Sequence, residues 1–240
     1  MSKDKIERKI AVIFATDVVG YSKHMEADEN ETIHSLRACE KILQNLFTQY
    51  DGRLFNTGGD SFLAEFPSAV SAVECAVEFQ NAIQTRNALE DTTTKLEFRI
   101  GINSGDVVKE KDNLLGDGVN IAARLEALAQ PNGITVSKVI HDFVKGKTKF
   151  DFNDLGVQKV KQNEFHAFDL LLNQSQKRRL PQGSLQKKVI VFASIISLIV
   201  LVGVFVFFQN KLLKNNIAPT DFAYELPSKP SLAIMPFKYH

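Results

Sequence analysis

The sequence contains little cysteine and no excess of charge of either sign. Its two cysteines, Cys39 and Cys75, lie in apolar patterns of helical type without C-x-x-C spacing, which speaks against a disulfide scaffold and a zinc module. We expect both thiols to be reduced and buried. The 29 Lys and Arg nearly balance the 28 Asp and Glu, so charge gives no reason to expect a nucleic-acid partner.

Several common functional motifs are absent as well. No G-x-x-x-x-G-K-[ST] loop occurs, so the sequence lacks the phosphate-binding loop of the P-loop enzymes. The five histidines show no metal-ligand spacing. No repeat of about 20 to 50 residues is visible, which excludes a solenoid.

One long apolar run is present. Residues 189–208 are apolar except for Ser194 and Ser197, and twenty residues at a rise of about 1.5 Å match a hydrocarbon core of about 30 Å. Because a buried core helix is rarely apolar on every face, we expect one transmembrane helix here. This run divides the chain into a soluble domain over 1–172, a basic linker over 173–188, the span, and a tail over 209–240 that we expect to be extracytoplasmic and truncated.

Basic residues are more frequent before the run than after it. The residues before it are Lys177, Arg178, Arg179, Lys187 and Lys188, and those just after it are Lys211 and Lys214. The positive-inside rule then predicts a single-pass inner-membrane protein with its N-terminal domain in the cytoplasm. A solvated linker is the alternative interpretation of these residues.

Hydrophobic periodicity predicts the elements of the N-terminal domain. Strands are expected at 10–14, 52–55, 62–66, 96–102, 134–136, 150–160 and 164–171, and helices after Asp28, after Ser68, from about 118 and at 138–143. Asp28 and Glu31 resemble a capping box. This order predicts an α+β fold, a ferredoxin-like antiparallel sheet covered by helices.

Two aspartates are candidates for a metal site. Asp17 ends a buried-type strand, and Asp60 lies in the tight hairpin of what should be the adjacent strand. Two carboxylates brought together at a sheet edge repel each other unless a cation lies between them. Each alone is equally interpretable as a residue that stabilises a turn.

A third segment, residues 115–126, adds Asn120 and Arg124. The two are four residues apart and project from one face of a helix near its N-terminus, where an anion is favoured. An amide and a guanidinium there could hold a sugar and a phosphoryl oxygen. Without the other segments, a polar helix residue and a surface ion pair would explain them.

Together these segments resemble the class III nucleotidyl cyclase catalytic domain, over most of residues 8–171. The resemblance is carried by Phe14-Ala-Thr-Asp-Val-Val-Gly-Tyr-Ser22, Phe55-Asn-Thr-Gly-Gly-Asp-Ser-Phe-Leu-Ala-Glu-Phe66, Arg99-Ile-Gly-Ile-Asn103 with Gly105-Asp106, and the run from Gly116 to Glu126. The order of cyclase, membrane span and Lys229-Pro-Ser-Leu-Ala-Ile-Met-Pro-Phe237 is similar to a bacterial, membrane-anchored subgroup with a further C-terminal region.

The resemblance implies a head-to-tail homodimer with two equivalent sites. One protomer would hold two Mg²⁺ or Mn²⁺ ions through Asp17, Asp60 and the Val18 carbonyl, and the other would contribute Asn120 and Arg124. The implied phosphate-binding groups are the backbone N–H groups near Gly20 and Tyr21, and Lys161. The implied reaction is adenylate cyclisation, in which the 3′-hydroxyl of ATP attacks the α-phosphorus and yields 3′,5′-cyclic AMP and pyrophosphate.

Two positions depart from the family pattern, and both belong to base recognition. Adenylate cyclases usually have Lys where this chain has Asn56 and Asp where it has Asn113, whereas guanylate cyclases tend to have Glu and Cys. An amide both donates and accepts, so adenine is favoured and GTP stays an alternative. Asp112 precedes the expected Asp position by one residue.

Two other functions compete with this interpretation. Gly58-Gly-Asp-Ser-Phe62 is similar to the Gly-Gly-Asp-Glu-Phe motif of diguanylate cyclases, but Ser61 replaces the glutamate and that motif has no place for the Asn120 helix. A catalytically silent module that dimerises or binds nucleotide would be expected to lack a metal aspartate or Arg124. The sequence retains all three.

Overall fold

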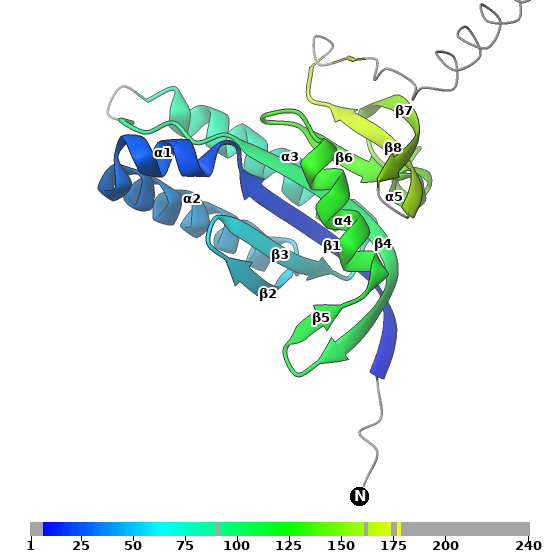
Figure 1. Cartoon of the computed structure of the whole chain (residues 1–240). Helices are drawn as coiled ribbons and strands as arrows, with labels where there is room; N and C mark the ends of the chain where they lie inside the picture. The colour runs from blue at the N-terminus through cyan, green and yellow to red at the C-terminus, as the bar shows by residue number, and fades with distance from the viewer. Residues whose placement is uncertain (1–6, 90–91, 161–162, 174–176, 179–240) are drawn as a thin grey trace, which may run out of the picture. The chain divides into compact units, whose positions relative to one another are not determined.

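The computed structural model describes residues 7–89, 92–160, 163–173 and 177–178 (Figure 1). Along this part of the chain the strands are β1 (Glu7–Val18), β2 (Arg53–Gly58), β3 (Ser61–Phe66), β4 (Phe98–Glu110), β5 (Asn113–Leu115), β6 (Ile134–Ser137), β7 (Asp151–Val160) and β8 (Asn163–Leu171). The helices are α1 (Tyr21–Ala27), α2 (Glu29–Gln49), α3 (Ala69–Asn87), α4 (Asp117–Leu128) and α5 (Lys138–Val144).

The strands form one mixed sheet. Its order is β2-β3-β1-β4-β6-β8-β7, and β5 pairs with β4. The described strand pairs are antiparallel except β4 with β6, where Ile100 lies opposite Ile134 in parallel register. The prediction of a wholly antiparallel sheet is therefore wrong at this pair. The reason is the crossover through α4, which returns the chain to the start of β4 before β6 begins.

The larger core lies between the sheet and the helices α2 and α3. Alternate residues of β1, among them Phe14 and Val18, point into it because side chains of a strand alternate between faces. Phe14 is fully buried and its ring makes an edge contact with Phe47 and a tilted one with Phe66, at centroid distances of 5.4 and 5.8 Å. Cys39 and Cys75 are free and buried in this core, as predicted.

The opposite face of the sheet carries α4. The other residues of β1, Ala11, Ile13 and Ala15, form a smaller cluster with Ala122 of α4. In Figure 1, α4 crosses this face over β1 and β4, with α2 and α3 behind the sheet. The sheet thus has one face closed by two long helices and one face partly covered by a single helix.

Helix starts follow their capping residues. The Asp28 carboxylate accepts a hydrogen bond from the Glu31 N–H at 3.0 Å and begins α2, and Ser68 accepts from the Val70 N–H at 3.1 Å and begins α3. The short elements α1 and β5 were not predicted, and β1 and β4 extend beyond their apolar runs. The reason is that β1 and β4 pair over their whole length, from Glu7 opposite Lys109 to Val18 opposite Phe98.

The predicted span at 189–208, most of the linker at 173–188 and the tail at 209–240 lie outside the described residues. Within the part of the chain that is described, no helix is long and apolar enough to cross a membrane.

Candidate active site

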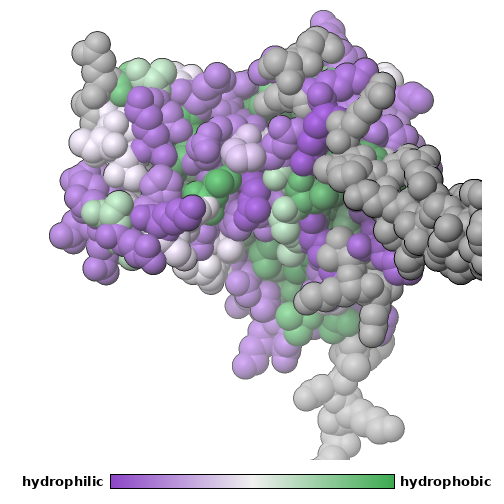
Figure 2. Space-filling view, turned by 45° about the horizontal axis from the view of Figure 1, so that its top comes forward, coloured by the Kyte–Doolittle hydropathy of each residue, from purple (hydrophilic) through white to green (hydrophobic). Residues whose placement is uncertain are grey.

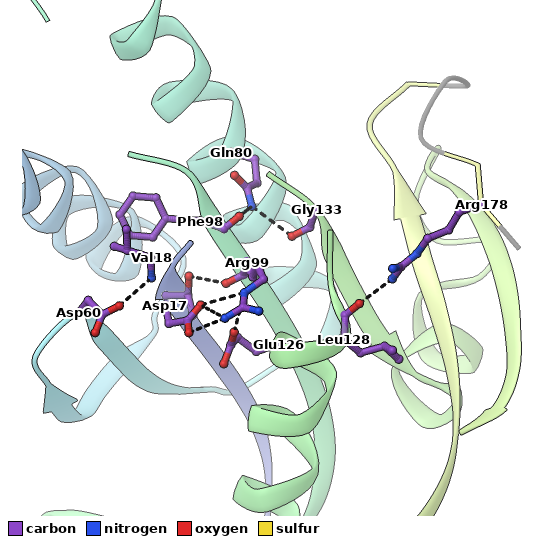
Figure 3. Close-up of polar contacts among 11 residues, drawn as sticks. Asp17, Val18, Asp60, Gln80, Phe98, Arg99, Glu126, Leu128, Gly133 and Arg178 are labelled. Carbon is purple, nitrogen blue, oxygen red and sulfur yellow. Dashed lines mark hydrogen bonds and ion pairs between the residues drawn. The ribbon is translucent and has the colours of Figure 1, made fainter. Parts of the chain in front are cut away.

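Asp17 and Asp60 lie beside each other at one end of the sheet. Asp17 is the penultimate residue of β1, and Asp60 follows Gly59 in the two-residue turn between β2 and β3. Gly59 has φ +65°, the left-handed region that the first central position of such a hairpin turn requires. The Asp60 carboxylate accepts a hydrogen bond from the Val18 N–H at 3.3 Å. The hairpin turn therefore places Asp60 next to the end of β1 (Figure 3).

Arg99 of β4 neutralises Asp17. The two residues are directly opposite each other in the β1–β4 register, and Arg99 Nη2 donates to both Asp17 oxygens at 2.8 and 3.0 Å. Arg99 Nε also lies 3.2 Å from Glu126 Oε1, on α4. Figure 3 shows the Asp17 and Glu126 side chains pointing toward this guanidinium from two sides. One arginine thus serves two carboxylates, with Asp60 close by.

Neither Arg99 nor Glu126 was predicted from the sequence to have a role of its own at the site. The signal that could have found Arg99 is the strand pairing itself, because opposite charges directly across an antiparallel pair stabilise it. To use this signal, one must know the register between β1 and β4, whose residues Asp17 and Arg99 are 82 positions apart in the chain. Glu126 required knowledge of which face of α4 lies on the sheet.

Two acidic groups at this site, Asp60 and Glu126, have raised pKa values. Burial, and secondarily the charge of Asp17, raises the pKa of Asp60. Burial raises the pKa of Glu126 to about 8, and the neighbouring Asp17 carboxyl adds to the shift. The hydrogen bond to Asp17 raises the pKa of Arg99, so its guanidinium stays charged. The site therefore has more acidic groups than one arginine can neutralise.

The donor set fits a divalent cation without being a complete side-chain cage. Among the described residues, no cluster of three or more His, Cys, Asp or Glu side chains is placed to hold a metal ion. Mg²⁺ is commonly held by one or two carboxylates together with substrate phosphates, and Asp17 and Asp60 supply two. A cation would compete with Arg99 for Asp17, and the Glu126 carboxyl group is a second partner for Arg99. The Val18 backbone N–H donates a hydrogen bond to Asp60. The role of the Val18 carbonyl as a metal ligand stays a prediction.

Close packing fixes α4 on the sheet. A Cβ at Gly101 of β4 would overlap the backbone of Ala122 and Glu126, and one at Gly105 would meet the Gly118 Cα at 3.0 Å. The Asn103 side-chain amide donates to the Gly118 carbonyl at 3.0 Å. Three residues of one strand face, two of them glycines, thus let the helix backbone lie directly on β4.

Asn120 and Arg124 face away from the carboxylates of their own chain. Residues two positions apart on a helix point about 200° apart, so Arg124 cannot share the direction of Glu126, which contacts Arg99. Asn120 is exposed, and Arg124 is half-buried. The Arg124 Nη1 atom is buried without a hydrogen-bond partner in the described structure. The surface ion pair considered as an alternative for Arg124 is not among the salt bridges of this part of the chain.

The residues predicted to bind nucleotide lie on neighbouring elements. Asn56 is on β2 and Asn113 begins β5, and these two strands are in contact. Asn113 Oδ1 accepts from the Leu114 N–H at 2.9 Å. Gly20, with φ +66°, leads from β1 into α1, which begins at Tyr21. Lys161 lies outside the described residues.

The sequence matches one known protein family over most of its length. The family model for the adenylate and guanylate cyclase catalytic domain matches residues 3–173. The chain therefore belongs to the class III nucleotidyl cyclases.

Individual relatives agree with this assignment. The chain is 45% identical over 165 residues to "Putative adenylate cyclase 3" of Rhizobium meliloti (strain 1021), a match that covers 68% of this chain and 28% of that protein. The chain thus spans less than a third of that relative. An adenylate/guanylate cyclase/hydrolase structure from Silicibacter pomeroyi is 35% identical, with a TM-score of 0.65, and covers 70% of this chain and 100% of the other.

The adenylyl cyclase CyaB of P. aeruginosa shares the fold. Its structure is 21% identical, with a TM-score of 0.62, and covers 72% of this chain and 100% of the other.

Proposed function

We propose that the chain is an adenylate cyclase that forms 3′,5′-cyclic AMP and pyrophosphate from ATP. The observation that carries the proposal is the division of the site. The carboxylates of Asp17 and Asp60 lie together at one end of the sheet. Arg124 has a buried N–H group without a hydrogen-bond partner, and it lies on a different side of α4 from Glu126, which faces that end. The name of the Rhizobium relative supports adenylate over guanylate.

This division supports a site shared between two copies of the chain. The clefts of about 430 and 550 Å³ beside Glu65 and Gln80 include none of Asp17, Asp60 and Arg124 in their linings. The α4 face also has partly exposed apolar residues, Phe55, Leu63 and Val119. Figure 2 shows hydrophobic surface gathered toward the lower part of the molecule within hydrophilic surroundings. A head-to-tail homodimer would bring Arg124 of one copy to the carboxylates of the other.

Each group then has a separate task. Asp17 and Asp60 would hold two Mg²⁺ or Mn²⁺ ions, which when bound lower the pKa of the ribose 3′-hydroxyl and neutralise the departing pyrophosphate. Asn120 would orient the ribose, and the Arg124 guanidinium would stabilise charge that develops on the α-phosphoryl oxygens. The N–H groups near Gly20 and Tyr21, with Lys161, would hold the terminal phosphates.

The substrate is tested by incubating the purified chain with Mn²⁺ and either ATP or GTP, and separating the products chromatographically. Cyclic AMP from ATP is the expected product. Cyclic GMP from GTP in its place would identify a guanylate cyclase, the alternative that Asn56 and Asn113 leave open. Absence of both products, with nucleotide still bound, would instead indicate a silent dimerisation or binding module.

The shared site is tested by mixing two inactive variants, Asp17→Ala and Arg124→Ala. Each homodimer lacks one half of both sites, whereas the mixed dimer retains one intact site. Partial recovery of activity on mixing is therefore expected. No recovery, despite exchange of subunits measured independently, would overturn the interface placement.

We further propose that residues 189–208 anchor the chain in the inner membrane with the catalytic domain in the cytoplasm. The apolar run and the excess of Lys and Arg before it support this. Protease treatment of spheroplasts should leave the catalytic domain intact. Digestion of that domain from outside would reverse the orientation.

A further inference from the structure

Arg178 makes a dense set of contacts at a distance from the carboxylate site. Its guanidinium donates to both oxygens of Asp169, from Nε at 2.7 Å and from Nη2 at 3.1 Å. The same Nη2 donates to the Leu128 carbonyl at 2.7 Å (Figure 3). The Arg178 main-chain carbonyl accepts from the Asn153 side chain at 2.6 Å. This residue therefore connects the segment after β8 with β7, β8 and α4.

Asp169 requires such a partner. Its side chain is 8% exposed, and a buried carboxylate without a cation is costly. Thr135 donates a hydrogen bond to Asp169 Oδ1 at 2.8 Å. Among the described residues, Arg178 is the cation that forms a salt bridge with Asp169. The pair thus holds Arg178 on the sheet.

The contact with Leu128 links this pair to the candidate active site. Leu128 is the last residue of α4, and its carbonyl belongs to the negative, unsatisfied end of the helix. A guanidinium at that point donates a hydrogen bond to the carbonyl, and its positive charge interacts favourably with the negative end of the helix dipole. The same helix carries Asn120 and Arg124. Anything that moves Arg178 therefore acts on the end of the helix that presents these residues.

We propose that Arg178 is a positioning residue for the cyclase reaction, which couples the start of the linker after the catalytic domain to the placement of α4. The proposal rests on the proposed function, because its effect on turnover acts through Arg124. A shift of about 1 Å at a catalytic group can cost about 100-fold in rate. A pull on the linker would reach the active site through this contact.

The first test is the kinetics of Arg178→Ala, with Lys177→Ala as the matched control. Lys177 is an exposed cation in the same segment. We expect kcat of Arg178→Ala to fall about 10- to 100-fold with little change in KM, because Arg124 acts on charge that develops in the transition state. Lys177→Ala should keep wild-type kinetics. Equal activity of Arg178→Ala and wild type would overturn the proposal.

A double variant separates positioning from simple charge neutralisation. Arg178→Ala alone leaves Asp169 buried and unpaired, which lowers the melting temperature. Adding Asp169→Asn removes that charge and should restore the melting temperature, yet the Leu128 carbonyl still lacks its donor. We expect kcat to stay low in this double variant. Recovery of kcat together with stability would show that Arg178 only neutralises Asp169 and would reject the positioning role.

Hydrogen exchange provides a readout that does not depend on activity. In Arg178→Ala and in the double variant, amides of residues 117–128 should exchange faster than in wild type and in Lys177→Ala. Unchanged exchange across this helix would overturn the coupling. If wild type forms no cyclic nucleotide, the proposed function fails, and the exchange measurement still decides whether Arg178 holds α4.

Discussion

The two faces of the central sheet are built on different principles. On the α2 and α3 side, β1 contributes Phe14 and Val18 to a large apolar core. On the α4 side, the same strand contributes Ala11, Ile13 and Ala15 and then Asp17, and α4 packs against glycines of β4. The larger apolar cluster lies on the α2 and α3 face, so we expect that face to contribute most of the folding free energy, whereas the other face carries partly buried charges.

The largest expected effect is a loss of stability from a substitution on the sheet face that α2 and α3 cover. Phe14→Ala removes a fully buried ring that contacts Phe47 and Phe66. We expect a loss of about 3–5 kcal/mol in the free energy of unfolding, because the cavity cannot close. Chemical denaturation measures this, with Phe14→Leu as the milder control. A loss below that of Phe14→Leu would show that this face is not the main source of stability.

The next effect belongs to the open face and should leave stability unchanged. Arg124→Ala removes a guanidinium whose Nη1 has no hydrogen-bond partner in the described structure, so the change breaks no hydrogen bond of that atom. We expect turnover to fall about 100- to 1000-fold at an unchanged melting temperature, by analogy with loss of one preorganised donor. Arg37→Ala, an exposed arginine of α2, is the control. A large drop in melting temperature for Arg124→Ala would make it a structural residue.

Gly101→Ala tests the contact between α4 and the sheet. Its Cβ would overlap the backbone of Ala122 and Glu126, so the helix must move. We expect a destabilisation of about 1–3 kcal/mol, measured by thermal unfolding, together with reduced turnover. Gly58→Ala is the stability control because a Cβ there meets nothing within 4 Å. Equal melting temperatures for both variants would contradict the close approach of α4.

The last effect concerns Glu126 and pH. Its pKa is raised from 4.5 to about 8 by burial and by Asp17, so the folded chain keeps a proton that the unfolded chain has lost. This contribution to stability is complete below about pH 4.5 and is lost as pH rises toward 8. In metal-free buffer, Glu126→Gln should be more stable than wild type at pH 8.5 and equal to it at pH 4.5.

The titration has a clear counter-result. Asp60 also has a raised pKa, so the variant should flatten the decline of stability with pH without abolishing it. Identical pH profiles of wild type and Glu126→Gln, measured by thermal unfolding with a chelator present, would show that Glu126 does not titrate in this range.

Local patterns predicted most of the elements and named most of the candidate residues. Alternation in β1 and the helical spacing of α2 and α3 depend on neighbours within a few positions, and the Asp28 and Ser68 caps act within one turn. The resemblance at Asp17, Asp60 and Arg124 led to the family, which the family model confirms over residues 3–173. Their individual roles stay predictions.

The family and the helix and strand periodicity were therefore determined by the sequence alone. Only the tertiary structure decided that Arg99 neutralises Asp17, that Glu126 shares this arginine, that β4 and β6 run parallel, and that Arg178 donates to the Leu128 carbonyl at the end of α4. Each of these depends on the register or packing of segments distant in the chain. Residue type gives the charge of such groups, but the pairing of strands and the face of a helix decide which charge each one meets.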